Sequence, residues 1–347
     1  MKFILNIGMH KTGSSSIQQT LKSFSSDTAA YLGIGHPNNS GLLMTMFMSD
    51  PHNYSGHQLN NRSPKEVKEL TNKFDGKFYE FCNKHVGKDI IASAEDMTLI
   101  SEDDLANMKV KLDDMFDDYL IVGYVRPPNS LMSSAFQQRV AGGISAKRLF
   151  NLYPHYRQKL EKFDNVFGQY RVLLTQFDRG ALFENDVVLD FAQKAGIHLN
   201  KGDVVNDNAA RSLEATAVAY VERRHIQEPA KYPGSPIDNR KLMNKLAGLG
   251  DSRVRLHKEL TQPVLDQNET DLDWVSERLG VEIRDEPYMG SDALRDLEQL
   301  NDIAAQFLPD VLKILAETVD EKPVQNHALV AECVNLLRKV IRAQKKS

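Results

Sequence analysis

The sequence is poor in several features that would point at once to a class of protein. Only two cysteines, Cys82 and Cys333, occur among 347 residues, which excludes a disulfide-built scaffold and indicates a reducing compartment. No apolar run approaches the roughly 20 residues that a transmembrane helix needs. The N-terminal run KFILN is too short for a signal peptide. We therefore expect a cytoplasmic protein without a membrane span.

Charge and metal-binding patterns are equally sparse. The formal net charge is −4, so the chain lacks the overall basic character that suits nucleic acid. The ten histidines are scattered, and neither an H-x-x-x-H nor a C-x-x-C pair is present. We expect His52 and His57, in a loop-like region, to be solvated. The sequence thus predicts no nucleic-acid partner and no metal site.

Apolar runs bounded by turn residues predict four strands, separated or followed by segments with a helical period. The second and third runs are almost continuously apolar, which is typical of parallel strands covered on both faces. Alternating strands and helices predict βαβ units. The sequence therefore predicts an α/β protein with a three-layer, P-loop-like fold around a central parallel sheet. The strands are expected at 3–8, 89–94, 119–125 and 170–177, and the helices at about 14–25, 65–84, 102–116, 129–140 and 145–162.

The chain divides into a core and a mainly helical remainder. We assign residues 1–228 to the core and residues 229–347 to a helical extension packing on it. Within the core, residues 33–64 are rich in Gly, Asn, Ser, Pro and His, which predicts a long loop. The run LLMTMFM inside it would cover apolar surface, as in a folded lid. The extension would close over an acceptor or form a subunit contact, which leaves a homo-oligomer open.

The most informative segment is the loop GMHKTGSSS, residues 8–16, which follows the first predicted strand. In open α/β sheets, ligands bind at the carboxyl ends of the strands. Gly8 and Gly13 permit a tight turn, and successive backbone N–H groups from Thr12 to Ser16 would form an anion-binding nest at a helix N-terminus. Serine hydroxyls and the Lys11 charge add to this nest. A triphosphate-binding loop G-x-x-x-x-G-K-[ST] instead has its lysine after the glycine.

A second polar group follows the third predicted strand. Arg126 precedes two prolines, which keeps it extended at the strand end. Pro128 suits the first turn of a helix. On that helix Ser130, Ser134 and Gln138 fall on one face at i, i+4 spacing. An arginine at the strand end and a serine eight residues later could bind a second phosphate group.

The two segments together resemble the sulfotransferase superfamily, whose members use 3′-phosphoadenosine 5′-phosphosulfate (PAPS) as sulfuryl donor. The order is K-T-G-S-S-S after the first strand and R-x7-S after a later one. Further blocks, such as IIASAEDMTLIS and VNDNAARSLEA, look like bacterial sulfotransferase-like proteins associated with surface glycans, over roughly residues 1–225. The resemblance implies PAPS as co-substrate, adenosine 3′,5′-bisphosphate (PAP) as product, and a hydroxyl or amine acceptor on a carbohydrate or glycolipid. It implies that the nucleotide is bound by His10, Lys11, Thr12, Gly13, Ser14, Ser15, Ser16, Arg126 and Ser134.

The same resemblance implies two catalytic roles. Lys11 would stabilise charge on the departing phosphate oxygen. The acceptor needs a general base, and Glu95, which follows the second predicted strand, is our candidate. Glu95 could instead simply favour a helix N-terminus. His10 and Asp96 are rival bases.

Other residues and other functions remain open from the sequence. The basic residues Arg139, Lys147, Arg148 and Arg211 would form a rim for an anionic ligand or merely solvated helix faces. A small-molecule kinase would need a lysine after the glycine and an acidic magnesium ligand, which the Glu95–Asp96 pair matches only loosely. A nucleotide-binding or glycan-binding module without turnover would keep the same fold. An acceptor pocket could be lined by His36, Tyr54 and His57.

Overall fold

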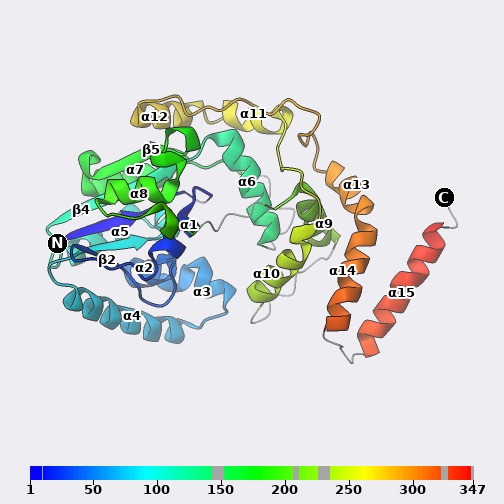
Figure 1. Cartoon of the computed structure of the whole chain (residues 1–347), viewed down its shortest axis with the longest axis horizontal. Helices are drawn as coiled ribbons and strands as arrows, with labels where there is room; N and C mark the ends of the chain where they lie inside the picture. Colours follow the sequence, from blue (N-terminus) through cyan, green and yellow to red (C-terminus); the bar gives the residue numbers. More distant parts are fainter. Residues whose placement is uncertain (10, 143–151, 206–210, 226–234, 322–326, 345–347) are drawn as a thin grey trace.

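A five-stranded parallel sheet forms the centre of the protein (Figure 1). The computed structural model describes residues 1–9, 11–142, 152–205, 211–225, 235–321 and 327–344. The strands lie in the order β2-β3-β1-β4-β5, and all neighbouring pairs are parallel. In register, Asn6 at the end of β1 lies opposite Ser93 on one side and Val122 on the other. The strands are β1 (Lys2–Asn6), β2 (Ala29–Tyr31), β3 (Asp89–Ser93), β4 (Asp118–Val125) and β5 (Val172–Gln176).

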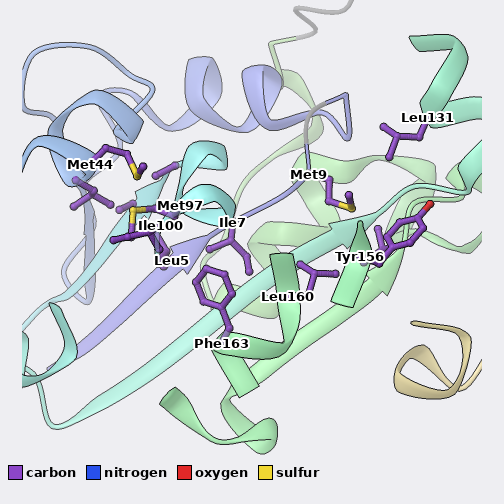
Figure 2. Packing of buried hydrophobic residues seen from close by; sticks show 14 of the residues in the cluster. Leu5, Ile7, Met9, Met44, Met97, Ile100, Leu131, Tyr156, Leu160 and Phe163 are labelled. Carbon is purple, nitrogen blue, oxygen red and sulfur yellow. The ribbon is translucent and has the colours of Figure 1, made fainter. Parts of the chain in front are cut away.

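Helices cover both faces of the sheet, because successive side chains of a strand point to opposite sides. In β1, Leu5 packs into one helical layer and Ile4 into the other. Figure 2 shows Leu5 and Ile7 among buried side chains that include Met44 and Phe163. Each fully buried side chain of this size contributes about 1.5–3 kcal/mol. The first layer holds α2 (Ser40–Phe47), α4 (Pro64–Lys84), α5 (Glu102–Leu112) and α7 (Tyr156–Phe167), and the second holds α1 (Ser14–Leu21) and α8 (Val187–Ala195).

The C-terminal part is mainly helical and packs on the sheet domain. Helix α13 lies against α9, helices α10 and α11 lie against α6, and α12 contacts both α7 and β5. Within the part of the chain that the structure describes, no helix is long and apolar enough to cross a membrane. The bounds of the helices named in this paragraph, together with those of α14 and α15, are α6 (Pro128–Ala141), α9 (Leu213–His225), α10 (Ser235–Lys245), α11 (Lys258–Asp266), α12 (Glu269–Leu279), α13 (Gln299–Gln306), α14 (Leu308–Glu321) and α15 (His327–Gln344).

Short helical elements make up many of the connections. The helix α3 (Ser55–Leu59) lies between α2 and α4. The 3-10 helices are η1 (Pro51–Asn53), η2 (Glu95–Leu99), η4 (Gln169–Arg171), η5 (Arg179–Ala181), η6 (Phe183–Asn185), η7 (Lys201–Asp203) and η8 (Leu246–Gly248).

The predicted three-layer, P-loop-like α/β fold with a mainly helical C-terminal part is confirmed. The four predicted strands correspond to β1, β3, β4 and β5, whereas the edge strand β2 was not predicted. The long loop predicted over 33–64 is wrong, because α2, η1 and α3 occupy much of it. Helix α2 is buried on nearly all sides, with Leu43, Met44 and Phe47 in the core.

Candidate active site

The candidate site lies where the chain leaves two neighbouring strands in opposite directions. After β1 the chain turns through α1 towards β2 at one edge of the sheet, and after β4 it passes through α6 and α7 towards β5 at the other. Ligands of open α/β sheets bind in the crevice at such a switch point, outside the carboxyl ends of the strands. The loop of residues 7–13 and Arg126 both lie at this point.

The loop after β1 changes direction through two residues with left-handed backbone conformations. Its first part continues along β4, with Ile7 N donating to Val122 O (2.9 Å) and Met9 N donating to Tyr124 O (3.3 Å). Lys11 (φ 69°) and Gly13 (φ 86°) then adopt left-handed conformations, which turn the chain into α1. Alternation of this kind forms a nest of N–H groups.

Glycine is required at position 13 on two grounds. Its positive φ disfavours any side chain, and a Cβ atom there would lie 2.5 Å from Cγ1 of Val187. Gly13 is also the N-cap of α1, and no side-chain hydrogen bond caps this helix. The first turn of α1 carries no acidic residue either, so its amides and dipole favour an anion at this end.

The hydroxyls of the loop differ in their surroundings. Thr12, Ser14 and Ser16 are buried, whereas Ser15 is exposed. Thr12 Oγ1 donates to Met9 O (2.6 Å), which fixes the turn. Ser14 Oγ is buried and has no hydrogen-bond partner among the described residues. Ser14 thus has hydrogen-bonding capacity that a bound oxyanion could use.

Arg126 connects the loop to the end of β4. Its Nη1 donates to Lys11 O (3.0 Å), and its Nε donates to Ser130 Oγ on α6 (3.1 Å). Its own carbonyl oxygen accepts from the hydroxyl of Tyr156 (2.7 Å). The arginine is therefore held on three sides, and the two sequence segments singled out above form one site. Ser134, one turn beyond Ser130 on α6, is half-buried.

Positive charge is concentrated around Lys11. Burial lowers the pKa of this ammonium group most, and the nearby Arg211 and Arg126 guanidinium groups lower it further. Glu95 acts in the opposite direction and raises the Lys11 pKa. These four side chains therefore lie within electrostatic reach of each other. Three cations and one carboxylate suit a ligand that carries several negative charges.

Arg211 also belongs to the candidate site. From the sequence alone it could equally have been a solvated residue. It is half-buried, and burial lowers its pKa. Its backbone carbonyl accepts from Gln137 Nε2 on α6 (2.8 Å). The adjacent Ser212 accepts from Ala215 N (3.1 Å) at the start of α9. These bonds fix the segment that carries Arg211, whose charge acts on Lys11.

Glu95 begins η2, directly after β3, and a buried polar network holds this edge of the sheet. Asn6 Nδ2 donates to Ser93 Oγ (2.9 Å), and Ala94 N donates to Asn6 O (2.9 Å). Asn39, before α2, accepts from Ser93 N (3.0 Å). Because Asn6, Ser93 and Asn39 are fully buried, the network places Glu95 on a rigid support beside the loop of β1.

The far end of η2 is held by Lys162 of α7. This buried lysine donates to Thr98 O (2.8 Å) and to Ile100 O. Burial, together with the neighbouring Lys159, lowers the pKa of Lys162 to about 8. The lysine thus satisfies the carbonyl groups that end η2 and anchors the segment that begins with Glu95.

The segment before α4 reaches the same edge through Tyr54. The Tyr54 hydroxyl donates to Asp96 Oδ2 (2.6 Å), and burial followed by the Asp96 charge raises the Tyr54 pKa. His57 is buried rather than solvated, so the prediction for it is wrong: its ring nitrogens face Thr45 Oγ1 and Arg62 Nη1, each at 2.9 Å. His36 is exposed and accepts from Asn38 N (3.1 Å).

Asp285 of the C-terminal part caps the helix that carries Ser130 and Ser134. Its carboxylate accepts from Asn129 N and Ser130 N, each at 2.9 Å, and its carbonyl accepts from Asn129 Nδ2 (3.0 Å). These bonds satisfy two of the free amides at the start of α6. The C-terminal part therefore fixes the helix to which Arg126 is bonded.

His10, Lys147 and Arg148 lie outside the described residues. Arg139 of α6 is half-buried, and burial lowers its pKa. It lowers the pKa of Lys159 on α7, after the larger effect of burial. No three His, Cys, Asp or Glu side chains within the described ranges are placed to hold a metal ion together.

Comparison with known proteins finds several solved structures that are similar to this chain. Neither a protein-family model nor a curated protein sequence matches this chain. A sulfotransferase from Alicyclobacillus acidocaldarius is 14% identical with a TM-score of 0.41, and the match covers 82% of this chain and 96% of that one. The sulfotransferase domain of the Synechococcus PCC 7002 olefin synthase is 14% identical with a TM-score of 0.38, and the match covers 71% and 92%.

A third structure is the sulfotransferase domain from the curacin biosynthetic pathway, at 11% identity and a TM-score of 0.36, with 78% of this chain and 97% of that one covered. All three are described as sulfotransferases.

The electrostatics of Lys11 predict a pH dependence. Anion binding favours the protonated lysine, and the pKa of free Lys11 lies below the ordinary value. The affinity of this site for an anionic ligand, with PAP as the probe, is therefore expected to fall as pH rises through this lowered pKa. In Arg211→Gln one cause of the lowered Lys11 pKa is removed. PAP should then bind more weakly overall, and its affinity should fall at a higher pH than in the wild type. Calorimetric titrations over a pH series test this, and a fall at the same pH in both proteins would contradict it.

Proposed function

We propose that the protein is a PAPS-dependent sulfotransferase that transfers the sulfuryl group to a hydroxyl or amine acceptor, with a carbohydrate or glycolipid as the expected class. The observation that carries this proposal is the hydrogen bond from Arg126 Nη1 to Lys11 O. It joins the loop expected to hold a 5′-phosphosulfate to the arginine expected to hold a 3′-phosphate. A single ligand with two anionic groups would fit such a pair of sites.

The residues present fit the two anionic ends of this donor. The amides from Thr12 to Ser15, the unpartnered Ser14 hydroxyl and the Lys11 ammonium group would hold the 5′ end, whereas the Ser16 amide already donates to Gly13 O (3.0 Å). Arg126, with Ser134 on the following helix, would hold the 3′-phosphate. Arg211 adds positive charge that a singly anionic ligand would not require. His10 is proposed as a further contact of the 5′ end.

Lys11 and Glu95 would supply the chemistry of an in-line displacement. Glu95 accepts the proton of the acceptor group as the new bond to sulfur forms. Lys11 stabilises the negative charge on the phosphate oxygen as its bond to sulfur breaks, and PAP leaves. Such transfers depend mainly on positioning and charge stabilisation, which the fixed loop and the rigid support of Glu95 provide. The Glu95 charge raises the Lys11 pKa, which supports the proximity of the two groups that this step requires.

Calorimetric titration with PAP, AMP and Mg-ATP tests this proposal. We expect the wild type to bind PAP more tightly than AMP or Mg-ATP, because only PAP carries a 3′-phosphate in addition to a 5′-phosphate. Arg126→Ala should weaken PAP binding by about 10–100-fold, since hydrogen bonds to charged groups contribute about 1.5–3 kcal/mol. AMP binding should weaken less than PAP binding in this variant, because AMP lacks the 3′-phosphate and loses only the support that Arg126 gives to the loop.

Arg157→Ala is the matched control for this experiment. Arg157 is an exposed arginine that pairs with Glu161 on α7 (2.8 Å), and it is not among the charges that act on Lys11. Its removal should leave PAP binding unchanged. Preference for Mg-ATP over PAP would overturn the proposal in favour of a small-molecule kinase. Binding of none of the three nucleotides would overturn it in favour of a module without turnover.

A further inference from the structure

Helix α14 is apolar on two faces, and only one of them is covered. Val311 and Ile314 pack against the body of the protein. Leu308, Leu312, Leu315 and Val319 are 38–45% exposed. The spacing of these four residues is i, i+4, i+7 and i+11, which makes one continuous stripe along the helix. This is the spacing of a helix that packs against another helix.

Helix α15 carries a still wider apolar surface. Val330, Val334 and Leu337 form one row and are 51–61% exposed, and Leu329 and Leu336 form a second row at 40%. Figure 1 shows α15 running antiparallel to α14, at the end of the molecule remote from the sheet. Helices of this kind gain most of their stability from packing an apolar face. Two adjacent rows are wide enough for two neighbouring helices, and α14 of the same chain makes few close contacts with them.

The two helices also carry opposite charge. By sequence, α14 has four acidic residues and one lysine, and α15 has one acidic residue and three basic ones. Glu317 and Asp320 of α14 are exposed, as are Arg338 and Lys339 of α15. Two hairpins related by a two-fold axis can therefore place the acidic helix of each copy against the basic helix of the other. This surface is complementary to itself.

We propose that α14 and α15 form a dimerisation module, in which the hairpins of two copies close a four-helix bundle. Leu308, Leu312, Leu315 and Val319 of each copy pack against the apolar rows of α15 from the other. The second copy supplies the neighbour that the wide surface of α15 lacks. This assembly is independent of the chemistry proposed for the loop of β1.

Light scattering coupled to gel filtration tests the assembly on the full chain. The wild type should have the mass of two chains, and Leu315→Glu or Val334→Glu should have the mass of one. Val110→Glu is the matched control, because Val110 is an equally large apolar residue on α5 that is 69% exposed. This variant should keep the two-chain mass. A wild type of one-chain mass, or a Val334→Glu variant of two-chain mass, would overturn the proposal.

Charge reversal shows which helices meet. The double variants Glu317→Lys/Asp320→Lys and Arg338→Glu/Lys339→Glu each place like charges across the interface and should be monomeric alone. Mixed together, they restore acid against base at both contacts and should form a mixed dimer. A mixture that stays monomeric would contradict contact between α14 of one copy and α15 of the other. An intramolecular hairpin alone cannot produce the doubled mass.

The wild-type chain provides a readout that needs no substitution. Cys333 lies on α15 and is exposed in a single chain, whereas Cys82 is buried. Alkylation of Cys333 should become faster as the protein is diluted and the dimer separates. Cys82 should show no such dependence. A Cys333 rate that is independent of concentration, at concentrations that span the change in mass, would contradict burial of α15 in the dimer.

Discussion

Replacing Lys11 with methionine is expected to lower the rate of PAP release from PAPS by about 10²–10³-fold, the usual cost of removing a preorganised group that stabilises developing charge. Methionine keeps the length of the side chain and removes the ammonium group. The backbone carbonyl of Lys11, which accepts from Arg126 Nη1, is retained, so the loop should keep its attachment to β4. PAP release reports cleavage of the donor whatever the acceptor.

Lys159→Met is the matched control for Lys11→Met. Both lysines are half-buried, and burial followed by a neighbouring arginine lowers the pKa of each. The charges that act on Lys159 are those of Arg139 and Asp271, not those of the candidate site. The control should retain the wild-type rate. Equal rates for Lys11→Met and the wild type would rule out a role for the ammonium group in donor cleavage.

Glu95→Gln is expected to lower turnover by about 10²–10⁴-fold, the usual contribution of a general base, while PAP binding is kept. Glutamine keeps the size of the side chain and cannot accept the acceptor proton. Binding is retained because the amides and cations that hold the nucleotide remain in place. Initial rates at saturating PAPS and calorimetric titration with PAP separate the two effects.

Two variants distinguish the rival bases. Asp96→Asn keeps an oxygen that can accept the Tyr54 hydroxyl, and it should be nearly as active as the wild type. His10→Gln should mainly weaken PAP binding and should change the pH dependence of turnover little. Full turnover in Glu95→Gln, combined with loss in Asp96→Asn or His10→Gln, would transfer the role of base to that residue.

The sequence was sufficient for those parts of the fold that have a strong local pattern. The strands β3 and β4 are nearly continuous apolar runs, and such runs can only be buried strands or buried helices. The strands β1 and β5 were predicted from apolar runs bounded by turn residues. The edge strand β2 has three residues and no run to detect. Helix α2 was missed because Leu42 to Phe47 are all buried, so the segment has no polar face and hence no helical period.

In the candidate site, too, residues with a local sequence signal differ from residues that only the folded chain brings together. Lys11, Gly13 and Arg126 could be proposed from the sequence because each stands beside a strand end with its own local signal. Asp285 is 155 residues from Ser130 in the chain, and its capping bond exists only in the folded protein. The placing of Arg211 beside Lys11 also depends on tertiary contacts. Residues recruited from distant segments leave no spacing pattern that a single sequence can show.

The central claim is that the loop of β1 and Arg126 hold the two ends of one nucleotide, and a crystal structure with PAP bound tests it most directly. We expect the 5′-phosphate at the amides from Thr12 to Ser15, within reach of the Lys11 ammonium group. The 3′-phosphate is expected at the Arg126 guanidinium group, near Ser134. A nucleotide bound elsewhere, or a 3′-phosphate directed away from Arg126, would contradict the account.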